Sequence, residues 1–208
     1  SLYTKPYKNS TDLIKKLNDD NDVSGIIVQL PLPSNFDSLK IINSSSIKKD
    51  ADGLVENSKV MPATARGIKE LLKFYDVDFF GKKVTVFGRS KIVGSPTAKM
   101  FEEEGSMVTV CHSKTENNKE KAKDAEILVI AIGKPKLIDS SYVSKDQIVV
   151  DVGITREGKN LIGDVDFDNV KDIVGMITPV PGGVGQMTVL ALFENVVDLC
   201  YNAVLSRE

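Results

Sequence analysis

The chain contains few residues of the types that build metal sites and covalent cross-links. Its 208 residues include two cysteines, one histidine and no tryptophan. Cys111 and Cys200 lie far apart in apolar runs, and this spacing predicts neither a disulfide framework nor a metal site. The single histidine, His112, excludes His-rich metal centres and restricts a Ser-His-Asp triad to one position. We therefore expect no metal and a reducing, cytoplasmic setting.

The sequence also has little excess charge of either sign and few long apolar runs. Lys and Arg number 27 against 29 Asp and Glu, and this balance lacks the basic excess of a nucleic-acid-binding protein. No apolar run approaches the length that spans a bilayer, and residues 1–10 contain no signal-peptide core. We expect partners that are neither nucleic acid nor membrane. The length suits one large domain or two small ones.

The stretch Gly81–Gly105 has the pattern of a strand, a glycine-bearing turn and a helix. Val84–Phe87 is a β-branched and aromatic run of strand length. After the turn Gly88–Ser90, we expect Ser95 to cap a helix that ends before Gly105. Free N–H groups at such a helix start bind anions, commonly a nucleotide pyrophosphate. An ordinary turn stays open as an alternative, because G-x-S-x-x-x-G is not the G-x-G-x-x-G fingerprint.

The pattern around this stretch predicts a parallel sheet. Short Val- and Ile-rich runs lie at 107–111, 126–132 and 147–152, with helical patterns between some of them. Residues 173–177 predict an edge strand. Helices are expected at 62–75 and 187–204, and the earlier of these would connect two domains.

The N-terminal region predicts a smaller α/β unit, with helices over 10–18 and 36–43. Gly25–Leu30 is a nearly continuous apolar run, typical of a strand buried on both faces. Gln29 interrupts it near its carboxyl end, either as a satisfied core amide or as a ligand contact. Asp52 precedes a glycine, a pair that most often marks only a turn.

The end of the second predicted strand indicates which nucleotide would bind. An Asp or Glu there commonly holds the ribose 2′-hydroxyl of NAD. Cys111–Lys114 contains no carboxylate, whereas Ser113, Lys114 and Arg89 offer donors suited to a 2′-phosphate. This favours NADP, and the alternative is that these are solvated loop residues.

Several stretches occur in the order known from one family. GIIVQLPLP, KDADG, GRSKIVG, VTVCHSKT, DVGI, GDVDF and ITPVPGGVGQMT follow one another from about residue 10 to the last helix. The chain resembles the bifunctional methylenetetrahydrofolate dehydrogenase/methenyltetrahydrofolate cyclohydrolase family. The resemblance implies an α/β protein with a Rossmann-like NADP-binding domain at 65–186, built on a parallel sheet. A smaller α/β catalytic domain would comprise 1–64, and the C-terminal helix 187–208 would return to complete it.

The resemblance also implies an activity in one-carbon metabolism. A homodimer would oxidise 5,10-methylenetetrahydrofolate with NADP and hydrolyse the methenyl product to 10-formyltetrahydrofolate. A dehydrogenase without cyclohydrolase activity, or a folate- or nucleotide-binding relative without turnover, stays open as an alternative. The implied catalytic residues are Gln29 and Asp52. The implied cofactor residues are Gly88, Arg89, Ser90, Ser113 and Ile154, and the implied substrate-binding residues are Tyr3, Val28, Gln29, Leu30, Asp52, Pro181, Gly182, Gly183, Val184 and Gly185.

The chain departs from the family pattern most strongly near its start. Tyr3 resembles the beginning of the family's Y-x-x-x-K motif, but Tyr7 stands where the lysine is expected. The segment between the Asp52–Gly53 turn and Pro62 is also short. The catalytic domain is thus incomplete in the sequence, and we expect residues to be missing at Lys5–Pro6 and at Asn57–Ser58. The catalytic lysine would belong to the segment missing after Lys5.

Overall fold

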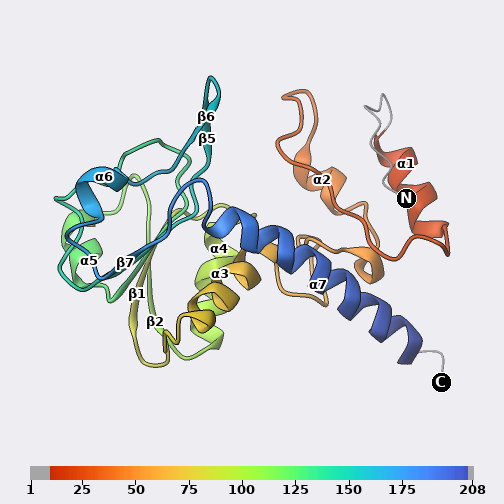
Figure 1. Ribbon diagram of the computed structural model, residues 1–208. Helices are drawn as coiled ribbons and strands as arrows, with labels where there is room; N and C mark the ends of the chain where they lie inside the picture. Colours follow the sequence, from red (N-terminus) through yellow and green to blue (C-terminus); the bar gives the residue numbers. More distant parts are fainter. Residues whose placement is uncertain (1–9, 206–208) are drawn as a thin grey trace. The chain divides into compact units, whose positions relative to one another are not determined.

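The computed structural model describes residues 10–205 and divides them into two compact units (Figure 1). The first comprises residues 10–63 with 192–205, and the second comprises residues 64–191. Helix α7 (Val184–Leu205) contributes its first turns to the second unit and its remaining turns to the first. No described helix is long and apolar enough to cross a membrane.

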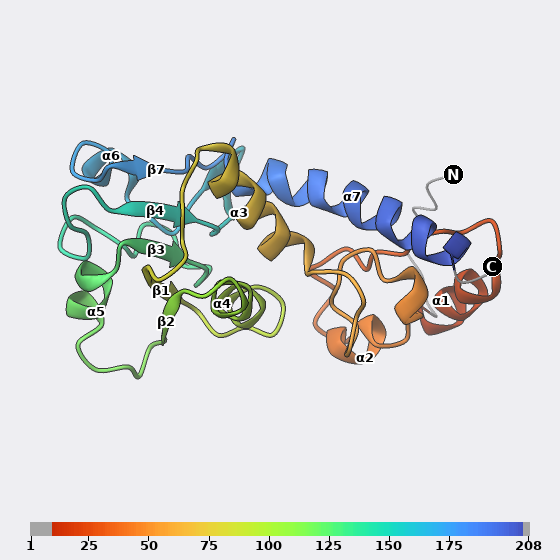
Figure 2. The same cartoon turned by 90° about the horizontal axis from the view of Figure 1, so that it is seen from below.

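The second unit is built on a five-stranded parallel sheet in the order β2-β1-β3-β4-β7 (Figure 2). The strands are β1 (Lys83–Phe87), β2 (Met107–Cys111), β3 (Ile127–Ile130), β4 (Ile148–Asp151) and β7 (Met176–Ile177). Every residue of β3 is buried, as a parallel strand covered on both faces requires. In the register of the sheet, Val86 lies between Val110 and Val129.

Helices and a hairpin complete this unit. They are α3 (Ala63–Phe74), α4 (Gly94–Glu103), α5 (Asn118–Asp124), α6 (Phe167–Val170) and the antiparallel pair β5 (Thr155–Glu157) and β6 (Asn160–Ile162). Helix α4 packs beside β1 and β2, and α5 packs beside β1. An apolar cluster that includes Phe87, Leu128 and Val149 forms the core on one side of the sheet.

The predicted strands of this unit are confirmed, with changes at their ends. Strand β3 ends at Ile130, two residues earlier than expected, because the N–H groups of Ile132 and Gly133 donate to the Asp164 carboxylate instead of to a neighbouring strand. The expected edge strand over 173–177 is reduced to β7. The β5–β6 hairpin and α6 were not predicted.

The first unit contains α1 (Ser10–Asp19), α2 (Ser38–Ile42), the 3₁₀ turn η1 (Ile47–Lys49) and the last turns of α7. Asp37 caps α2 by accepting a hydrogen bond from Lys40 N at 3.1 Å. Asn195 of α7 is fully buried and donates to the carbonyl oxygens of Ala51 and Met61 at 2.9 and 3.0 Å. These bonds anchor α7 to the loop that contains the Asp-Gly turn.

The expected buried strand Gly25–Leu30 is wrong in its extent. Only Ile26 pairs, in a single parallel bridge with Asp50, where Ile26 N donates to Lys49 O at 2.6 Å. A strand buried on both faces needs hydrogen-bonded neighbours on both sides, and the described residues supply one short partner. Ile27 is consequently 46% exposed.

The expectation that residues are missing at Asn57–Ser58 stays a prediction. Ser58 N donates to Val55 O at 3.0 Å, and Asn57 adopts the left-handed conformation with φ of 61°. The chain therefore passes through this junction in a closed turn. Tyr3 and the Lys5–Pro6 junction lie outside the described residues.

Candidate active site

The strand order reverses between β1 and β3. The connection from β1 leads to one side of the sheet and the later strands continue on the other, which is the switch point where open α/β sheets bind ligands at their carboxyl ends. Gly88, with φ of 117°, follows β1 there. A side chain at Gly88 would collide with Ala131 O, and one at Gly94 would collide with Gly88 O. The glycines are thus needed for close backbone approach.

Ser90 organises the start of α4, where Ser95 was expected to act. The Ser90 side-chain hydroxyl accepts hydrogen bonds from Val93 N at 3.1 Å and Gly94 N at 3.2 Å. The Ser90 backbone carbonyl accepts a third hydrogen bond, from Ser95 N. Ser95 lies in the first turn, so the prediction of Ser95 as N-cap is wrong. The loop folds Ser90 back onto the helix start and satisfies N–H groups that were expected to be free. Because its oxygen accepts both bonds, the exposed Ser90 hydroxyl keeps its own proton for a ligand.

A tight turn follows β2 and presents two exposed side chains. His112 Nδ1 accepts from Lys114 N at 3.2 Å, and His112 O accepts from Thr115 N at 2.9 Å. Ser113 and Lys114 are exposed, as is Arg89 after β1. Residues 112–115 contain no carboxylate to compete with a phosphate.

The loop between β7 and α7 is shorter than expected. Val184 and Gly185 form the first turn of α7, and Gly183 packs so closely that an added Cβ would lie 2.6 Å from Pro179 O. Pro181 and Gly182 are exposed, whereas Gly183 and Val184 are buried. Ile154 is 56% exposed, and its Cδ1 lies 3.4 Å from the Cβ position at Gly185. Ile154 and the start of α7 therefore adjoin each other.

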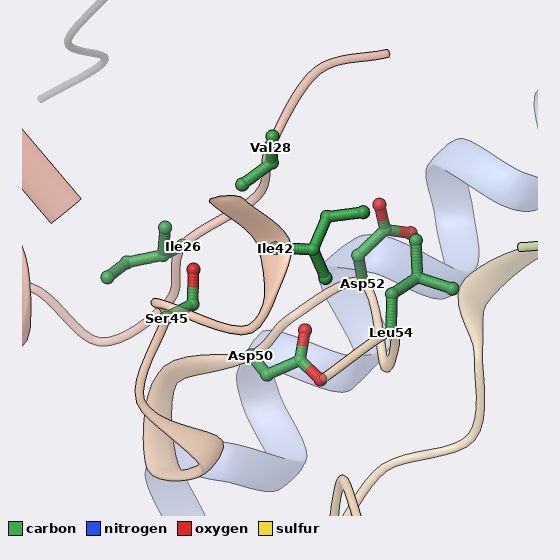
Figure 3. A pocket seen from close by; sticks show the side chains of 7 residues that line it. All are labelled: Ile26, Val28, Ile42, Ser45, Asp50, Asp52 and Leu54. Atoms are coloured by element: carbon green, nitrogen blue, oxygen red, sulfur yellow. The ribbon is translucent and has the colours of Figure 1, made fainter. Parts of the chain in front are cut away.

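In the first unit, two aspartates of the KDADG stretch line a small cavity (Figure 3). Asp50 is buried and holds the turn, because its carboxylate accepts from Gly53 N at 3.1 Å and Val55 N at 2.9 Å. Asp52 is half-buried, and burial, followed by the charge of Asp50, raises its pKa to about 6. The cavity is lined by Ile26, Val28, Ile42, Ser45, Asp50, Asp52 and Leu54. The turn-forming role proposed as the alternative for Asp52 thus belongs to Asp50.

Gln29 is exposed, and its amide nitrogen donates to Leu30 O at 2.9 Å. The interpretation of Gln29 as a satisfied core amide is therefore wrong, whereas a ligand contact stays a prediction. Val28 shares the cavity with Asp52, but Gln29 and Leu30 are not among its lining residues.

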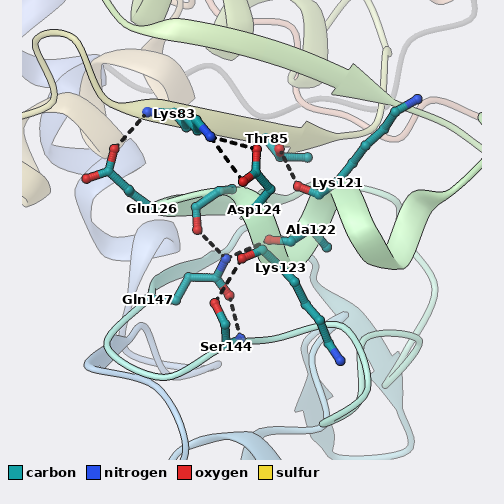
Figure 4. Close-up of polar contacts among 10 residues, drawn as sticks. Lys83, Thr85, Lys121, Ala122, Lys123, Asp124, Glu126, Ser144 and Gln147 are labelled. Carbon is teal, nitrogen blue, oxygen red and sulfur yellow. Dashed lines mark hydrogen bonds and ion pairs between the residues drawn. The ribbon is translucent and has the colours of Figure 1, made fainter.

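A second cavity, of about 320 Å³, lies at the opposite edge of the sheet beside the first residues of β1 and β2. Polar groups near it are paired within the protein (Figure 4): Thr85 donates to Lys121 O at 3.0 Å, and Lys83 pairs with Asp124. Buried Gln147 donates to Ala122 O and Ala125 O, both at 2.6 Å. These bonds satisfy carbonyls at the end of α5 and give this edge a structural role.

Sequence reasoning missed two buried acceptors, Asp50 and Asp164. The stretch around Asp50 was noted for its Asp-Gly turn and its resemblance, and the stretch around Asp164 was noted only for its resemblance. A carboxylate flanked by small or apolar residues, as in Gly163-Asp-Val, is the signal that could have found them, because such a group must accept several hydrogen bonds when buried.

The parallel sheet, the glycine turn at its switch point and the helix that begins after it define a dinucleotide-binding α/β protein. Comparison with known families specifies this class further. The sequence model described as tetrahydrofolate dehydrogenase/cyclohydrolase, NAD(P)-binding domain, matches residues 62–204, and the model of the catalytic domain matches residues 5–52. The chain belongs to the tetrahydrofolate dehydrogenase/cyclohydrolase family.

Individual relatives agree with this assignment. The bifunctional protein FolD of Clostridium beijerinckii is 48% identical over 191 residues, covering 88% of this chain and 68% of the relative. That of Bacillus cytotoxicus is 47% identical over 195 residues, covering 89% and 68%. The crystal structure of the bifunctional enzyme FolD from Campylobacter jejuni has a TM-score of 0.88 at 39% identity and covers 96% of this chain and 75% of that one. The Trypanosoma brucei enzyme, complexed with NADP cofactor and inhibitor, has a TM-score of 0.87 at 32% identity, covering 97% and 74%.

Proposed function

We propose that the protein oxidises 5,10-methylenetetrahydrofolate to the 5,10-methenyl form with NADP and hydrolyses that product to 10-formyltetrahydrofolate. The observation that carries this proposal is the match of one chain to both domains of the family. The geometry of the cofactor loops and the raised pKa of Asp52 support it independently. Most of the catalysis would consist of positioning, because hydride transfer needs two planar groups held in contact with water excluded.

The residues at the switch point fit a dinucleotide. When bound, NADP supplies the acceptor for the hydride. Gly88 would allow the backbone to approach the phosphates, while the exposed Arg89 guanidinium and Ser90 hydroxyl would donate to them. Ser113 and Lys114 would bind the 2′-phosphate, and Ile154 would line the site.

Asp52 would act on the folate. Because its pKa is about 6, the carboxylate is mostly ionised at pH 7 and can accept hydrogen bonds from the pterin amine. The methenyl product is a delocalised cation, which a partly buried carboxylate stabilises more strongly than an exposed one. Val28, Gln29 and Leu30 would contact the pterin.

Ring hydrolysis needs a proton shuttle, for which a partly desolvated lysine beside Gln29 is suited. One observation favours a second candidate function, a dehydrogenase without cyclohydrolase activity. The sequence places Tyr7 where the Y-x-x-x-K motif has its lysine, and Tyr3 at the start of that motif lies outside the described residues.

Two activity measurements test the proposal and separate the alternatives. NADPH formation from methylenetetrahydrofolate and NADP, followed by absorbance, distinguishes an enzyme from a binding protein. Loss of methenyltetrahydrofolate absorbance then reports the cyclohydrolase. We expect both activities, and absence of both with intact NADP binding would identify a non-catalytic relative.

We further propose a homodimer in a cytoplasmic setting. Strand β2 is an edge of the sheet, and it exposes Met107 and Val110 at 57% and 38%. An uncovered apolar edge strand is suited to pairing with a second copy of the chain. The cytoplasmic setting is supported separately, because both cysteines are free, in keeping with a reducing compartment. Light scattering of the wild type and of Val110→Lys tests the dimer, and a monomeric wild type would contradict it.

A further inference from the structure

Two buried carboxylates lie at the carboxyl edge of the sheet and have no role in the proposed chemistry. Asp151 ends β4 and Asp164 follows β6, with exposed fractions of 3% and 0%. The Asp151 carboxylate accepts from Gly153 N at 2.9 Å, Asp164 N at 3.0 Å and Val165 N at 2.9 Å. It therefore joins the end of β4 to the segment that carries Asp164.

Asp164 in turn holds the loop that follows β3. Its Oδ2 accepts from Ile132 N and Gly133 N, both at 2.7 Å. Two successive N–H groups that converge on one point form an anion-binding concavity, and Gly133 has the positive φ, 71°, that suits such a shape. The distances are those of charge-assisted hydrogen bonds. The anion bound in this concavity is thus the protein's own Asp164 carboxylate.

The surrounding backbone is shaped to admit the two carboxylates. A side chain at Gly153 would collide with the Asp164 carboxyl group, and one at Gly163 would collide with the Asp151 carboxyl group. Each glycine lies beside the aspartate of the other segment. This reciprocal fit leaves neither carboxylate space to rotate away from its hydrogen-bond donors.

The loop that Asp164 holds is in direct contact with the proposed phosphate-binding turn. Ala131 N donates to Phe87 O at 2.8 Å, and Ala131 O lies where a side chain of Gly88 would be. Gly88 is bounded on its other side by Gly94 at the start of α4. A shift of residues 131–133 would therefore move Gly88, at the switch point where β1 and β3 separate.

We propose that Asp164 is a positioning residue for the dinucleotide: its buried carboxylate holds the loop 131–133 and, through it, the Gly88 turn in the shape that binds the cofactor. This inference rests on the proposed function. Stability alone is a weak reason for the charge, because Asp164 Oδ1 is buried with no hydrogen-bond partner among the described residues, and such an oxygen is costly. The strong bonds to Ile132 and Gly133 are what the carboxylate provides.

The test compares Asp164→Ala with Asp164→Asn in steady-state kinetics. We expect Asp164→Ala to raise the KM for NADP at least tenfold while the KM for methylenetetrahydrofolate changes less than twofold. Asp164→Asn keeps an oxygen that accepts both N–H groups, and we expect its KM for NADP to stay within about threefold of the wild type. Asp168→Ala, which removes an exposed carboxylate from α6, is the control and should change neither KM.

Equal effects on both KM values, or an Asn variant as impaired as the Ala variant, would overturn the proposal. If Asp164→Ala does not fold, Gly133→Ala perturbs the same loop from its open side, where an added Cβ meets nothing within 4 Å but strains the positive φ. We expect it to raise the KM for NADP, and an unchanged KM for NADP in Gly133→Ala would refute the inference. If the wild type forms no NADPH, the proposed function fails, and calorimetric affinities for NADP of wild type and variants replace the KM values.

Discussion

Substitution of Asp52 by asparagine should stabilise the protein and inactivate it. The pKa of Asp52 is about 6, compared with 3.8 for an unperturbed carboxyl, because burial and the Asp50 charge disfavour ionisation. The folded state thus binds this proton more tightly than the unfolded state does. Below pH 3.8 the group costs no stability, and the cost grows as pH rises through 6 and is complete above it.

The size of this effect follows from the two pKa values. Their difference corresponds to roughly 3 kcal/mol, and because solvent screens a half-buried carboxyl, we expect about 1–2 kcal/mol at pH 7.5. Asp52→Asn removes the charge, so its free energy of unfolding should exceed that of the wild type by this amount at pH 7.5 and equal it near pH 4. The corresponding rise in Tm is roughly 2–8 °C.

Activity should change in the opposite direction. An amide cannot hold the pterin amine or the developing cation by charge, and a hydrogen bond to a charged group contributes about 1.5–3 kcal/mol. We expect at least a tenfold loss in kcat/KM for methylenetetrahydrofolate with an unchanged affinity for NADP. Denaturant titrations at pH 4, 6 and 7.5 are run beside the kinetics.

Asp50→Asn is the matched control. Asp50 holds the turn through Gly53 N and Val55 N, so its loss should destabilise the protein where Asp52→Asn stabilises it. An Asp52→Asn variant that keeps full activity would refute the assignment to the folate. An Asp52→Asn variant that is no more stable than the wild type at pH 7.5 would refute the conclusion that the ionised Asp52 carboxylate is partly buried at a cost in stability.

Three further substitutions test other parts of the structure. Arg89→Ala should lower NADP affinity about tenfold or more while changing NAD affinity less, as calorimetry with both nucleotides would reveal; a wild type that binds both equally would contradict the preference for NADP. Gly94→Ala should weaken NADP binding, because its Cβ would collide with Gly88 O, and unchanged affinity would show that the turn tolerates this shift. Asn195→Ala leaves the carbonyls of Ala51 and Met61 unpaired and should cost about 1–3 kcal/mol of unfolding free energy, measured by urea titration; a loss below 0.5 kcal/mol would contradict the anchoring role.

Local patterns predicted much of the second unit. The strand Lys83–Phe87, the glycine turn and the helix ending before Gly105 could be predicted because each depends on neighbours a few residues away: strand propensity, and a positive φ that favours glycine. The helices at the ends of the chain could be predicted for the same reason. The absence of a carboxylate after β2 was likewise visible in the sequence.

Partners distant in sequence were decided by the tertiary structure alone. Gly25–Leu30 has the composition of a buried strand, but composition cannot show that only Ile26 finds a partner. Ser90 and Ser95 have the same capping chemistry, and the path of the loop places Ser90 on the donors. Asp164 lies 32 residues from Ile132, whose N–H it binds. A sequence pattern records which face of an element is apolar, whereas a buried polar group is satisfied only by the partner that the fold brings to it.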